Sequence, residues 1–186
     1  KTSHGSYIFN RISKEKHLII NSHANSLCPA IFFDRDGVII EDKHYISNPD
    51  DVKLMLGVKN LLKLAKKKGL VNIIVTNQSG IERGYFSWEE YEKVTFKMLE
   101  IIDSPDVIDA IYACGSSPTS DILDWRKPNP NMLLEAKNRF HIQIEESIMI
   151  GDRLSDLKAG LNSGVKIVVH VLTGKGKKER EEIIKF

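Results

Sequence analysis

The sequence predicts an α/β fold built on a mainly parallel sheet. From residue 30 onward, short apolar runs alternate with segments whose apolar residues recur at helical spacing. Four of the five apolar runs end where a polar cluster begins. This alternation is typical of parallel strands joined by crossover helices, and continuously apolar runs are typical of strands buried on both faces. With 186 residues, of which 41% are hydrophobic, the chain can bury one core.

Five runs are the candidate strands of this sheet. Each is four to six residues long and rich in branched or aromatic residues, as buried strands are. We expect strands at residues 30–33, 71–75, 108–112, 147–150 and 166–171.

Four helices are expected between these strands. Residues 58–65 carry apolar side chains at helical spacing, and Gly69 follows as a stop signal. Residues 87–102 begin with a capping box formed by Ser87 and Glu90. The other two helices are expected at residues 129–140, with Asn129 as the N-cap and Pro130 in the first turn, and at residues 154–163.

The two ends of the chain do not follow this alternation of predicted strands and helices. We treat residues 1–29 as an N-terminal extension without an assigned role, in which residues 7–9 and 18–20 are a candidate hairpin. Residues 30–174 form the main domain. Residues 175–186 are dominated by charge, and we expect a solvated tail there in preference to the start of a helix.

Composition excludes several classes of function. The 27 basic and 25 acidic residues leave a net charge of +2, which is too small to indicate binding to nucleic acid or to an anionic membrane. No apolar stretch approaches the roughly 18 residues that span a bilayer. The two cysteines lack metal-type spacing, which suits a reducing cytoplasm. We therefore expect a cytoplasmic protein, and we expect it to be a monomer.

Polar clusters stand where the strands of an open α/β sheet place their ligands, beyond the carboxyl ends. Because these ends meet at one edge of a parallel sheet, the four clusters are expected to converge. They are Asp34-Arg35-Asp36-Gly37, Thr76-Asn77-Gln78-Ser79-Gly80, Arg126-Lys127-Pro128 and Gly151-Asp152-Arg153-Leu154-Ser155-Asp156.

The residue types in these clusters suit phosphate chemistry. Asp34 and Asp36 point to the same side if the backbone stays extended, and Asp152 adds a third carboxylate, so a divalent ion such as Mg²⁺ is expected among them. Lys127 would neutralise phosphate oxygens, and Thr76 would donate hydrogen bonds. Together these residues indicate phosphoryl transfer to a carboxylate.

The four clusters, in this order, resemble the motifs of the haloacid dehalogenase (HAD) superfamily. The resemblance implies a Rossmann-like fold with helices on both faces of the sheet and no large cap domain. It also implies that Asp34 is the nucleophile that becomes an aspartyl phosphate and that Asp36 is the acid/base. Thr76 and Lys127 match the residues that hold the phosphoryl group. The implied Mg²⁺ ligands are Asp34, Asp152 and the backbone carbonyl of Asp36.

Within this superfamily the chain is similar to the subfamily of heptose bisphosphate and histidinol-phosphate phosphatases, on residues 76–86 and 126–130 in particular. The resemblance implies a small phosphorylated metabolite as substrate, with D-glycero-D-manno-heptose 1,7-bisphosphate, losing its 7-phosphate, as the leading candidate. Histidinol phosphate and other small monophosphates are alternatives, and a phosphate-binding domain without turnover is the alternative outside enzymes. The implied substrate contacts are Asp42, Tyr45, Asn77, Gln78, Arg126 and Arg153.

One departure from the subfamily concerns zinc. Many members carry four ligands before the Arg-Lys-Pro motif, whereas here the corresponding residues are Cys114-Gly115-Ser116 and Leu123-Asp124-Trp125. Because a structural zinc site normally has four protein ligands, we expect no zinc. Trp125 is expected to pack within the loop.

Two further side chains near the motifs keep alternative interpretations. Asp156 either occupies the first turn of a helix or supports the metal from behind its ligands, and His44 is expected to be an exposed loop residue.

Overall fold

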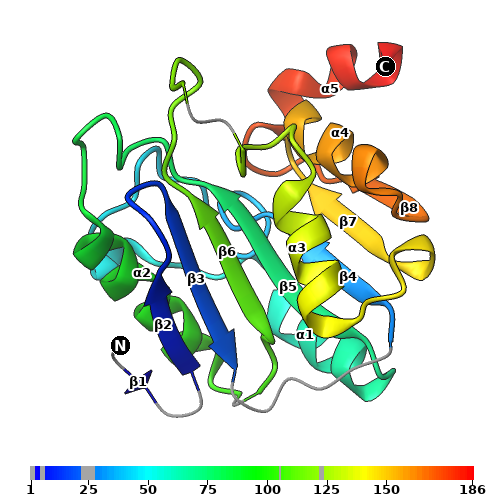
Figure 1. Ribbon diagram of the computed structural model, residues 1–186, viewed down its shortest axis with the longest axis horizontal. Coiled ribbons are helices and arrows are strands. Elements are labelled where there is room, and N and C mark those ends of the chain that lie inside the picture. Colours follow the sequence, from blue (N-terminus) through cyan, green and yellow to red (C-terminus); the bar gives the residue numbers. More distant parts are fainter. Residues whose placement is uncertain (1–2, 5–6, 22–27, 105, 122–123) are drawn as a thin grey trace.

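The computed structural model describes residues 3–4, 7–21, 28–104, 106–121 and 124–186. Within these ranges the chain forms an eight-stranded sheet in the order β1-β2-β3-β6-β5-β4-β7-β8 (Figure 1). The strands from β4 to β8 are parallel, and the three N-terminal strands are antiparallel. The predicted α/β fold with a mainly parallel sheet is confirmed.

All five predicted strands of the parallel part are present, with small shifts in their ends. The strand expected at 108–112 begins two residues later, because the carboxylate of Asp109 accepts hydrogen bonds from the backbone of Asn72 and from Lys66 below the start of the ladder. The strand expected at 71–75 continues to Asn77, because Thr76 and Asn77 pair with Ala113 and Cys114. The observed strands are β4 Ala30–Phe33, β5 Val71–Asn77, β6 Ala110–Cys114, β7 Ile148–Gly151 and β8 Ile167–His170.

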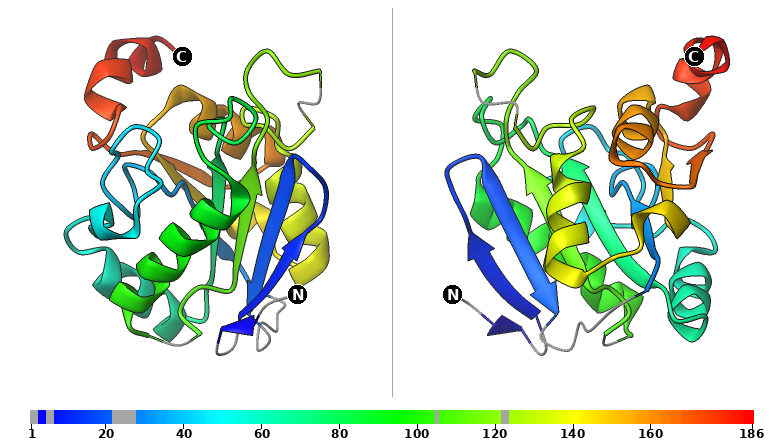
Figure 2. Two further views of the ribbon diagram at one scale, coloured as in Figure 1. Left: turned by 90° about the vertical axis from the view of Figure 1, so that its left-hand side faces the viewer. Right: turned by 45° about the vertical axis from the view of Figure 1, so that its right-hand side comes forward.

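Helices cover both faces of the sheet, as predicted (Figure 2). One face packs against α1 (Val58–Lys67) and α2 (Trp88–Ile102), and the other packs against α3 (Asn131–Phe140) and α4 (Leu154–Ser163). Alternate residues of the central strands divide between the two cores, so that Phe33 faces α1 and α2 while Phe32 faces α3.

The ends of the helices follow their caps. The predicted capping box of α2 is present, because Ser87 Oγ accepts from the Glu90 backbone and Glu90 accepts from the Ser87 backbone. Helix α3 begins at Asn131, one residue later than the expected first helical residue, Pro130. The side chain of Asn129 accepts a hydrogen bond from Asn131 N–H, so it closes the turn before the helix instead of serving as the N-cap.

The N-terminal segment joins the same sheet. The expected hairpin is confirmed as β2 (Tyr7–Arg11) paired with β3 (Lys16–Asn21), and the two-residue β1 (Ser3–His4) lies at its edge. Strand β3 pairs antiparallel with β6, from Lys16 opposite Cys114 to Ile20 opposite Ala110. Its side chains enter both cores, with Leu18 on the α3 face and Ile19 on the α2 face. These residues are therefore packed within the main sheet.

The C-terminal segment is helical where a solvated tail was expected. Helix α5 (Gly176–Lys185) exposes most of its surface, including Ile184, and Phe186 after it is exposed as well, so the apolar residues of this segment gave little signal of a helix. It is held at its start, where the carboxylate of Glu179 accepts a hydrogen bond of 2.8 Å from the backbone of Leu154.

The described helices include none with both the length and the apolar character of a membrane span. No large cap domain stands over the carboxyl edge of the sheet within the described ranges, as predicted.

Candidate active site

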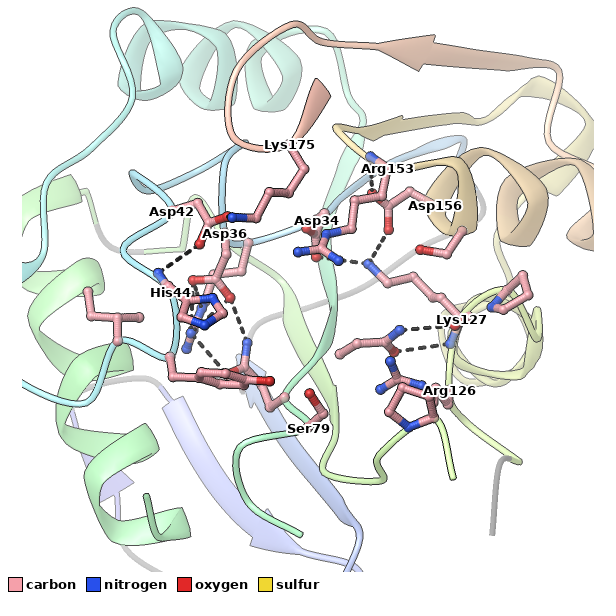
Figure 3. Close-up of a pocket in the computed structure, with 18 residues that line it drawn as sticks. Asp34, Asp36, Asp42, His44, Ser79, Arg126, Lys127, Arg153, Asp156 and Lys175 are labelled. Carbon is pink, nitrogen blue, oxygen red and sulfur yellow. Dashed lines mark hydrogen bonds and ion pairs between the residues drawn. The ribbon is translucent and has the colours of Figure 1, made fainter. Parts of the chain in front are cut away.

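The four polar clusters converge on one cavity of about 460 Å³ at the carboxyl edge of the sheet (Figure 3). Thr76 and Asp152 are buried and do not contribute to the lining. The other predicted site residues line it: Asp34, Asp36, Asp42, Tyr45, Asn77, Gln78, Arg126, Lys127 and Arg153.

A buried lysine joins two carboxylates at the base of the cavity. Lys127 Nζ lies 2.8 Å from Asp34 Oδ1 and 2.7 Å from Asp156 Oδ1, and it also donates to the carbonyl of Val75. Burial alone would lower the pKa of Lys127, but Asp156 and Asp34 outweigh burial and raise it to about 12. Burial raises the pKa of Asp34, and the Lys127 ammonium opposes that change. The lysine therefore stays charged and favours the ionised form of Asp34.

Asp34 is held in this position by the sheet. It follows β4 directly, and its N–H donates to the carbonyl of Ile150 on β7. Asp156 lies in the first turn of α4, where its carboxylate also accepts a hydrogen bond from the backbone of Arg153. The first of the two interpretations of Asp156 is thus observed, together with a lysine contact that the sequence did not indicate.

Asp152 is enclosed by two glycines. Its Oδ2 accepts from the backbone of Lys175, and a Cβ on Gly37 or Gly174 would lie 2.7 or 2.2 Å from that oxygen. Its Oδ1 is buried without a hydrogen-bond partner among the described residues. Burial, followed by the negative charges of Asp34 and Asp156, raises the pKa of Asp152 to about 7.

These carboxylates fit a divalent cation. One oxygen each from Asp34, Asp152 and Asp156 lies within 4.8 Å of the others, and Asp152 Oδ1 is unsatisfied. Hard cations such as Mg²⁺ take carboxylate oxygens as ligands. The predicted ligands Asp34 and Asp152 belong to this group, and Asp156 joins them. The side chain of Asp36 is not part of this group. The resemblance implied only its backbone carbonyl as a ligand.

Asp34 and Asp36 do not share partners, although the sequence suggested that their carboxylates would crowd each other. The chain leaves the extended conformation at Arg35, whose carbonyl accepts from the N–H groups of Ile39 and Ile40, so the alternation of side chains ends there. Asp36 instead accepts hydrogen bonds from Arg35 and Gln78.

Thr76 reaches the site through Gln78. Thr76 is buried, and its hydroxyl accepts a hydrogen bond of 2.8 Å from Gln78 Nε2, which also donates to Asp36. Gln78, predicted as a substrate contact, therefore uses its amide within the protein.

Asn77 clamps the segment that carries the lysine. Its side chain donates to the carbonyl of Lys127 and accepts from the N–H of Lys127, each at 3.0 Å. Arg126 lies beside it and donates to the carbonyl of Ser116. Burial lowers the pKa of Arg126, and nearby Arg153 and Arg83 act in the same direction.

The opposite wall of the cavity comes from the segment after β4. Asp42 accepts from the backbone of His44 and lies 3.3 Å from Lys175 Nζ. Burial alone would raise the pKa of Asp42, but His44 N–H and Lys175 lower it. His44 is exposed, as expected, and the ring of Tyr45 meets that of Tyr85 edge-on.

Two site residues, Arg35 and Lys175, received no role from sequence reasoning, and a third, Asp156, was left between a helix-start role and support of the metal. Arg35 lies between the two motif aspartates, Asp156 follows Asp152 by four residues, and Lys175 is the first residue of the segment expected to be a solvated tail. The position of Asp156 in the first turn of a helix was the one usable signal. Nothing in the sequence pattern places the side chain of Lys175 in the cavity.

The segment that departs from the zinc pattern is partly described. Cys114 is buried in β6, where burial raises the pKa of its thiol, and Ser116 is buried after it. Trp125 packs against Tyr112 and donates to Glu135, which confirms its packing role. Leu123 lies outside the described residues.

Comparisons with known proteins agree with this geometry. A family profile described as HAD-hyrolase-like matches residues 124–185. The D-glycero-beta-D-manno-heptose-1,7-bisphosphate 7-phosphatase of Helicobacter pylori is 41% identical over 74% of this chain and 80% of its own length. The enzyme of the same name from Haemophilus influenzae is 42% identical over 78% of this chain and 83% of its own length.

Solved structures give the same relationship. A putative HAD-like phosphatase from Mesorhizobium loti has a TM-score of 0.78 at 31% identity, over 85% of this chain and 80% of its own. A D,D-heptose 1,7-bisphosphate phosphatase from B. bronchiseptica, complexed with magnesium and phosphate, has a TM-score of 0.76 at 28% identity, over 83% of this chain and 86% of its own. By this similarity in sequence, fold and site, the chain belongs to the HAD superfamily, within its family of heptose bisphosphate phosphatases, and is a phosphatase.

Proposed function

We propose that the protein hydrolyses a phosphomonoester through a phosphorylated Asp34, with Mg²⁺ as cofactor. The observation that carries this proposal is the contact of the buried Lys127 ammonium with Asp34 and Asp156, beside the unsatisfied carboxylate of Asp152. A charged lysine and a set of carboxylates at one point suit a phosphoryl group held between cations.

The reaction has two displacements at phosphorus. In the first, the ionised Asp34 attacks, a bond from its oxygen to phosphorus forms, and the bond to the leaving oxygen breaks. Asp36 gives its proton to that oxygen. In the second, water attacks the aspartyl phosphate and gives a proton to Asp36, the bond to Asp34 breaks, and phosphate leaves. Both aspartates return to their starting states.

Each described residue has a part in this scheme. Lys127 neutralises charge on the phosphoryl oxygens, Thr76 is the matched hydrogen-bonding residue, and Asp34, Asp152 and Asp156 supply carboxylate oxygens for Mg²⁺. When bound, the cation supplies positive charge that lowers repulsion between the carboxylate and the phosphate. The magnesium and phosphate named with the B. bronchiseptica structure support this cofactor.

We further propose a heptose bisphosphate of the D-glycero-D-manno type as substrate, hydrolysed at its 7-phosphate. The names of the relatives support this choice. The cavity also carries cations beyond those at its base: Arg126 and Arg153 both line it, and neither forms an ion pair with the described residues. Two available guanidinium groups suit the second phosphate of such a substrate.

The test of the reaction is Asp34→Asn, with Asp103→Asn as the matched control at an exposed position. Asp34→Asn should lose phosphate release by about three orders of magnitude or more, because the nucleophile is gone. Acid-quenched wild-type protein should carry a phosphoryl group on Asp34 by mass spectrometry. An Asp34→Asn variant with normal turnover would refute the mechanism. Absence of turnover in the wild-type protein would favour the alternative of a phosphate-binding domain.

The test of the substrate is a comparison of kcat/KM for the heptose bisphosphate, histidinol phosphate and a sugar monophosphate. The bisphosphate should lead, and the lead should shrink in Arg153→Gln. Preference for histidinol phosphate would overturn the substrate assignment.

Four predictions accompany this function. The protein is cytoplasmic, it is a monomer, it holds no zinc, and residues 30–174 form the catalytic domain, with residues 1–29 and 175–186 as its terminal extensions, of which β3 and Lys175 contact it. Metal analysis of purified protein tests the zinc prediction directly, because a stoichiometric amount would contradict it.

A further inference from the structure

Arg35 is the largest of the side chains that the structure buries completely. Its guanidinium lies 5.1 Å from the ring centroid of Tyr91, and the same group turns its donors toward the acid/base Asp36. Burying a cation is costly unless it is paired, and Asp36 is the acid with which Arg35 forms an ion pair. Because burying this guanidinium is costly and it lies beside the acid/base, we expect Arg35 to have a role in the reaction.

The contact between them is a fork. Arg35 Nε lies 3.2 Å from Asp36 Oδ1, and Nη2 lies 3.0 Å from each of the two carboxylate oxygens. The other terminal nitrogen, Nη1, has no partner among the described residues. The guanidinium is therefore oriented chiefly toward Asp36 and Gln78.

Gln78 completes the arrangement from the neighbouring strand end. Its Oε1 accepts from Arg35 Nη2 at 3.1 Å, while its Nε2 donates 2.8 Å bonds to Asp36 Oδ2 and to Thr76 Oγ1. Exchanging the amide oxygen and nitrogen would turn an oxygen toward a carboxylate and a nitrogen toward a guanidinium. The chemistry of its neighbours thus fixes the orientation of this amide.

Asp36 is held on one side only. Its side chain retains 25% exposure and lines the cavity, whereas Arg35 and Gln78, which also border the cavity, are buried on its other side. The open side can exchange a proton with a bound molecule while the closed side fixes the direction of the carboxyl group.

We infer that Arg35 and Gln78 are positioning residues that aim Asp36 at the leaving oxygen and at the attacking water. The inference rests on the proposed function, because it requires Asp36 to be the acid/base. Gln78 also links this carboxylate to Thr76, the residue assigned to the phosphoryl group. Neither residue needs to touch the substrate.

The experiment compares two substrates that differ in their need for an acid. The leaving group of p-nitrophenyl phosphate departs without a proton, whereas the alkoxide of glycerol phosphate requires one. In Arg35→Lys and in Gln78→Met, kcat/KM for glycerol phosphate should fall by about tenfold to a hundredfold, and that for p-nitrophenyl phosphate by less than about threefold.

A second readout follows from the base role of Asp36. Water attack on the aspartyl phosphate should slow in both variants for either substrate. The p-nitrophenyl substrate should therefore give a burst of nitrophenolate of about one equivalent per site before a slow steady state. A purely structural defect would lower the fraction of active protein and would produce neither the selectivity nor the burst.

Two comparison variants make the result decisive. Asp36→Asn sets the largest selectivity that loss of the acid can cause. Asn72→Ala removes buried hydrogen bonds at the opposite end of β5, to the carbonyls of Leu62 and Val107, and should treat both substrates alike. If Arg35→Lys does not fold, Gln78→Met carries the test.

The outcomes separate the two proposals. If Asp36→Asn is selective but Arg35→Lys and Gln78→Met lose rate equally on both substrates without a burst, the positioning roles are refuted and the proposed function stands. A rise in KM alone in Gln78→Met would also refute them, since it would make Gln78 a substrate contact. If Asp36→Asn itself is unselective, the acid/base role fails and the positioning roles fail with it.

Discussion

Asn77 grips the backbone of Lys127 with both ends of its amide, donating to its carbonyl and accepting from its N–H at 3.0 Å. The clamp joins the end of β5 to the segment that precedes α3, and the peptide bond after Lys127 is cis. The position of the ammonium in the site thus depends on a residue that lies fifty positions earlier in the chain.

Replacement of Asn77 by Ala should lower kcat by about tenfold and the free energy of unfolding by about 1–3 kcal/mol, because two partly buried backbone groups lose their partner. Steady-state kinetics and urea unfolding measure both. A variant with unchanged kcat and a raised KM would show instead that Asn77 acts by binding substrate, as the sequence resemblance implies.

Lys127→Met should leave three carboxylates in the site without their internal cation. We expect a loss of about 3–5 kcal/mol in metal-free protein, since the remaining buried charges are uncompensated. Mg²⁺ should restore part of the stability, so the rise in Tm on adding Mg²⁺ should be larger for the variant than for the wild type. Equal rises in the two proteins would argue against a shared cation and lysine site.

Gly174→Ala tests the packing around Asp152. The new Cβ would lie 2.2 Å from Asp152 Oδ2 and 2.9 Å from the Cα of Gly37, so the carboxylate must move. The Mg²⁺ concentration for half-maximal activity should rise about tenfold. Gly57→Ala is the matched control, because Gly57 also has a positive φ but has no atom near the added Cβ. A comparable Mg²⁺ effect in that control would remove the explanation.

The raised pKa of Asp152 predicts how stability depends on pH. Between its usual value near 4 and about 7, the folded state holds this proton more tightly than the unfolded state does. The free energy of unfolding of metal-free protein should therefore fall as pH rises through this range. Mg²⁺ requires the ionised form, so it should raise Tm more at about pH 8 than at about pH 5.5. Thermal unfolding with and without MgCl₂ measures the difference, and a larger effect at the lower pH would contradict the assignment.

Ile19→Ala tests whether the N-terminal hairpin belongs to the cooperative unit. Ile19 is fully buried against the α2 face, and the substitution should cost about 2–5 kcal/mol in a single unfolding transition. A separate low-temperature transition, with the activity of the main domain retained, would show that the hairpin folds independently.

Features with local chemical signals were predictable from the sequence. Helix α2 begins at a capping box whose two partners are three residues apart, and α4 has the predicted bounds before Gly164. That the motif segments share one edge of the sheet was also predictable, because parallel strands bring their carboxyl ends together and the Lys127 segment lies between β6 and α3. The direct contact of Lys127 with Asp34 depends further on the Asn77 clamp, which the apolar pattern does not encode.

Other features depended on distant parts of the chain. Strand β3 lies in the N-terminal segment, outside the predicted alternation of strands and helices, whereas β6 belongs to that alternation. The apolar pattern of neither strand specifies its partner. Asp34 and Asp36 have different partners because the chain turns at Arg35, which alternation along a strand does not predict. Helix α5 has little buried apolar surface, so the signal used to recognise helices was weak there.

The antiparallel joining of β3 to β6 also bears on synthesis. Strand β3 is synthesised before its partner β6, which follows only about a hundred residues later, after β4, α1, β5 and α2. The nascent hairpin must wait with one edge unpaired, and its apolar residues are exposed for that interval. Completion of β6 would then seal the growing sheet on that side, which makes this docking a natural late step in the maturation of the chain.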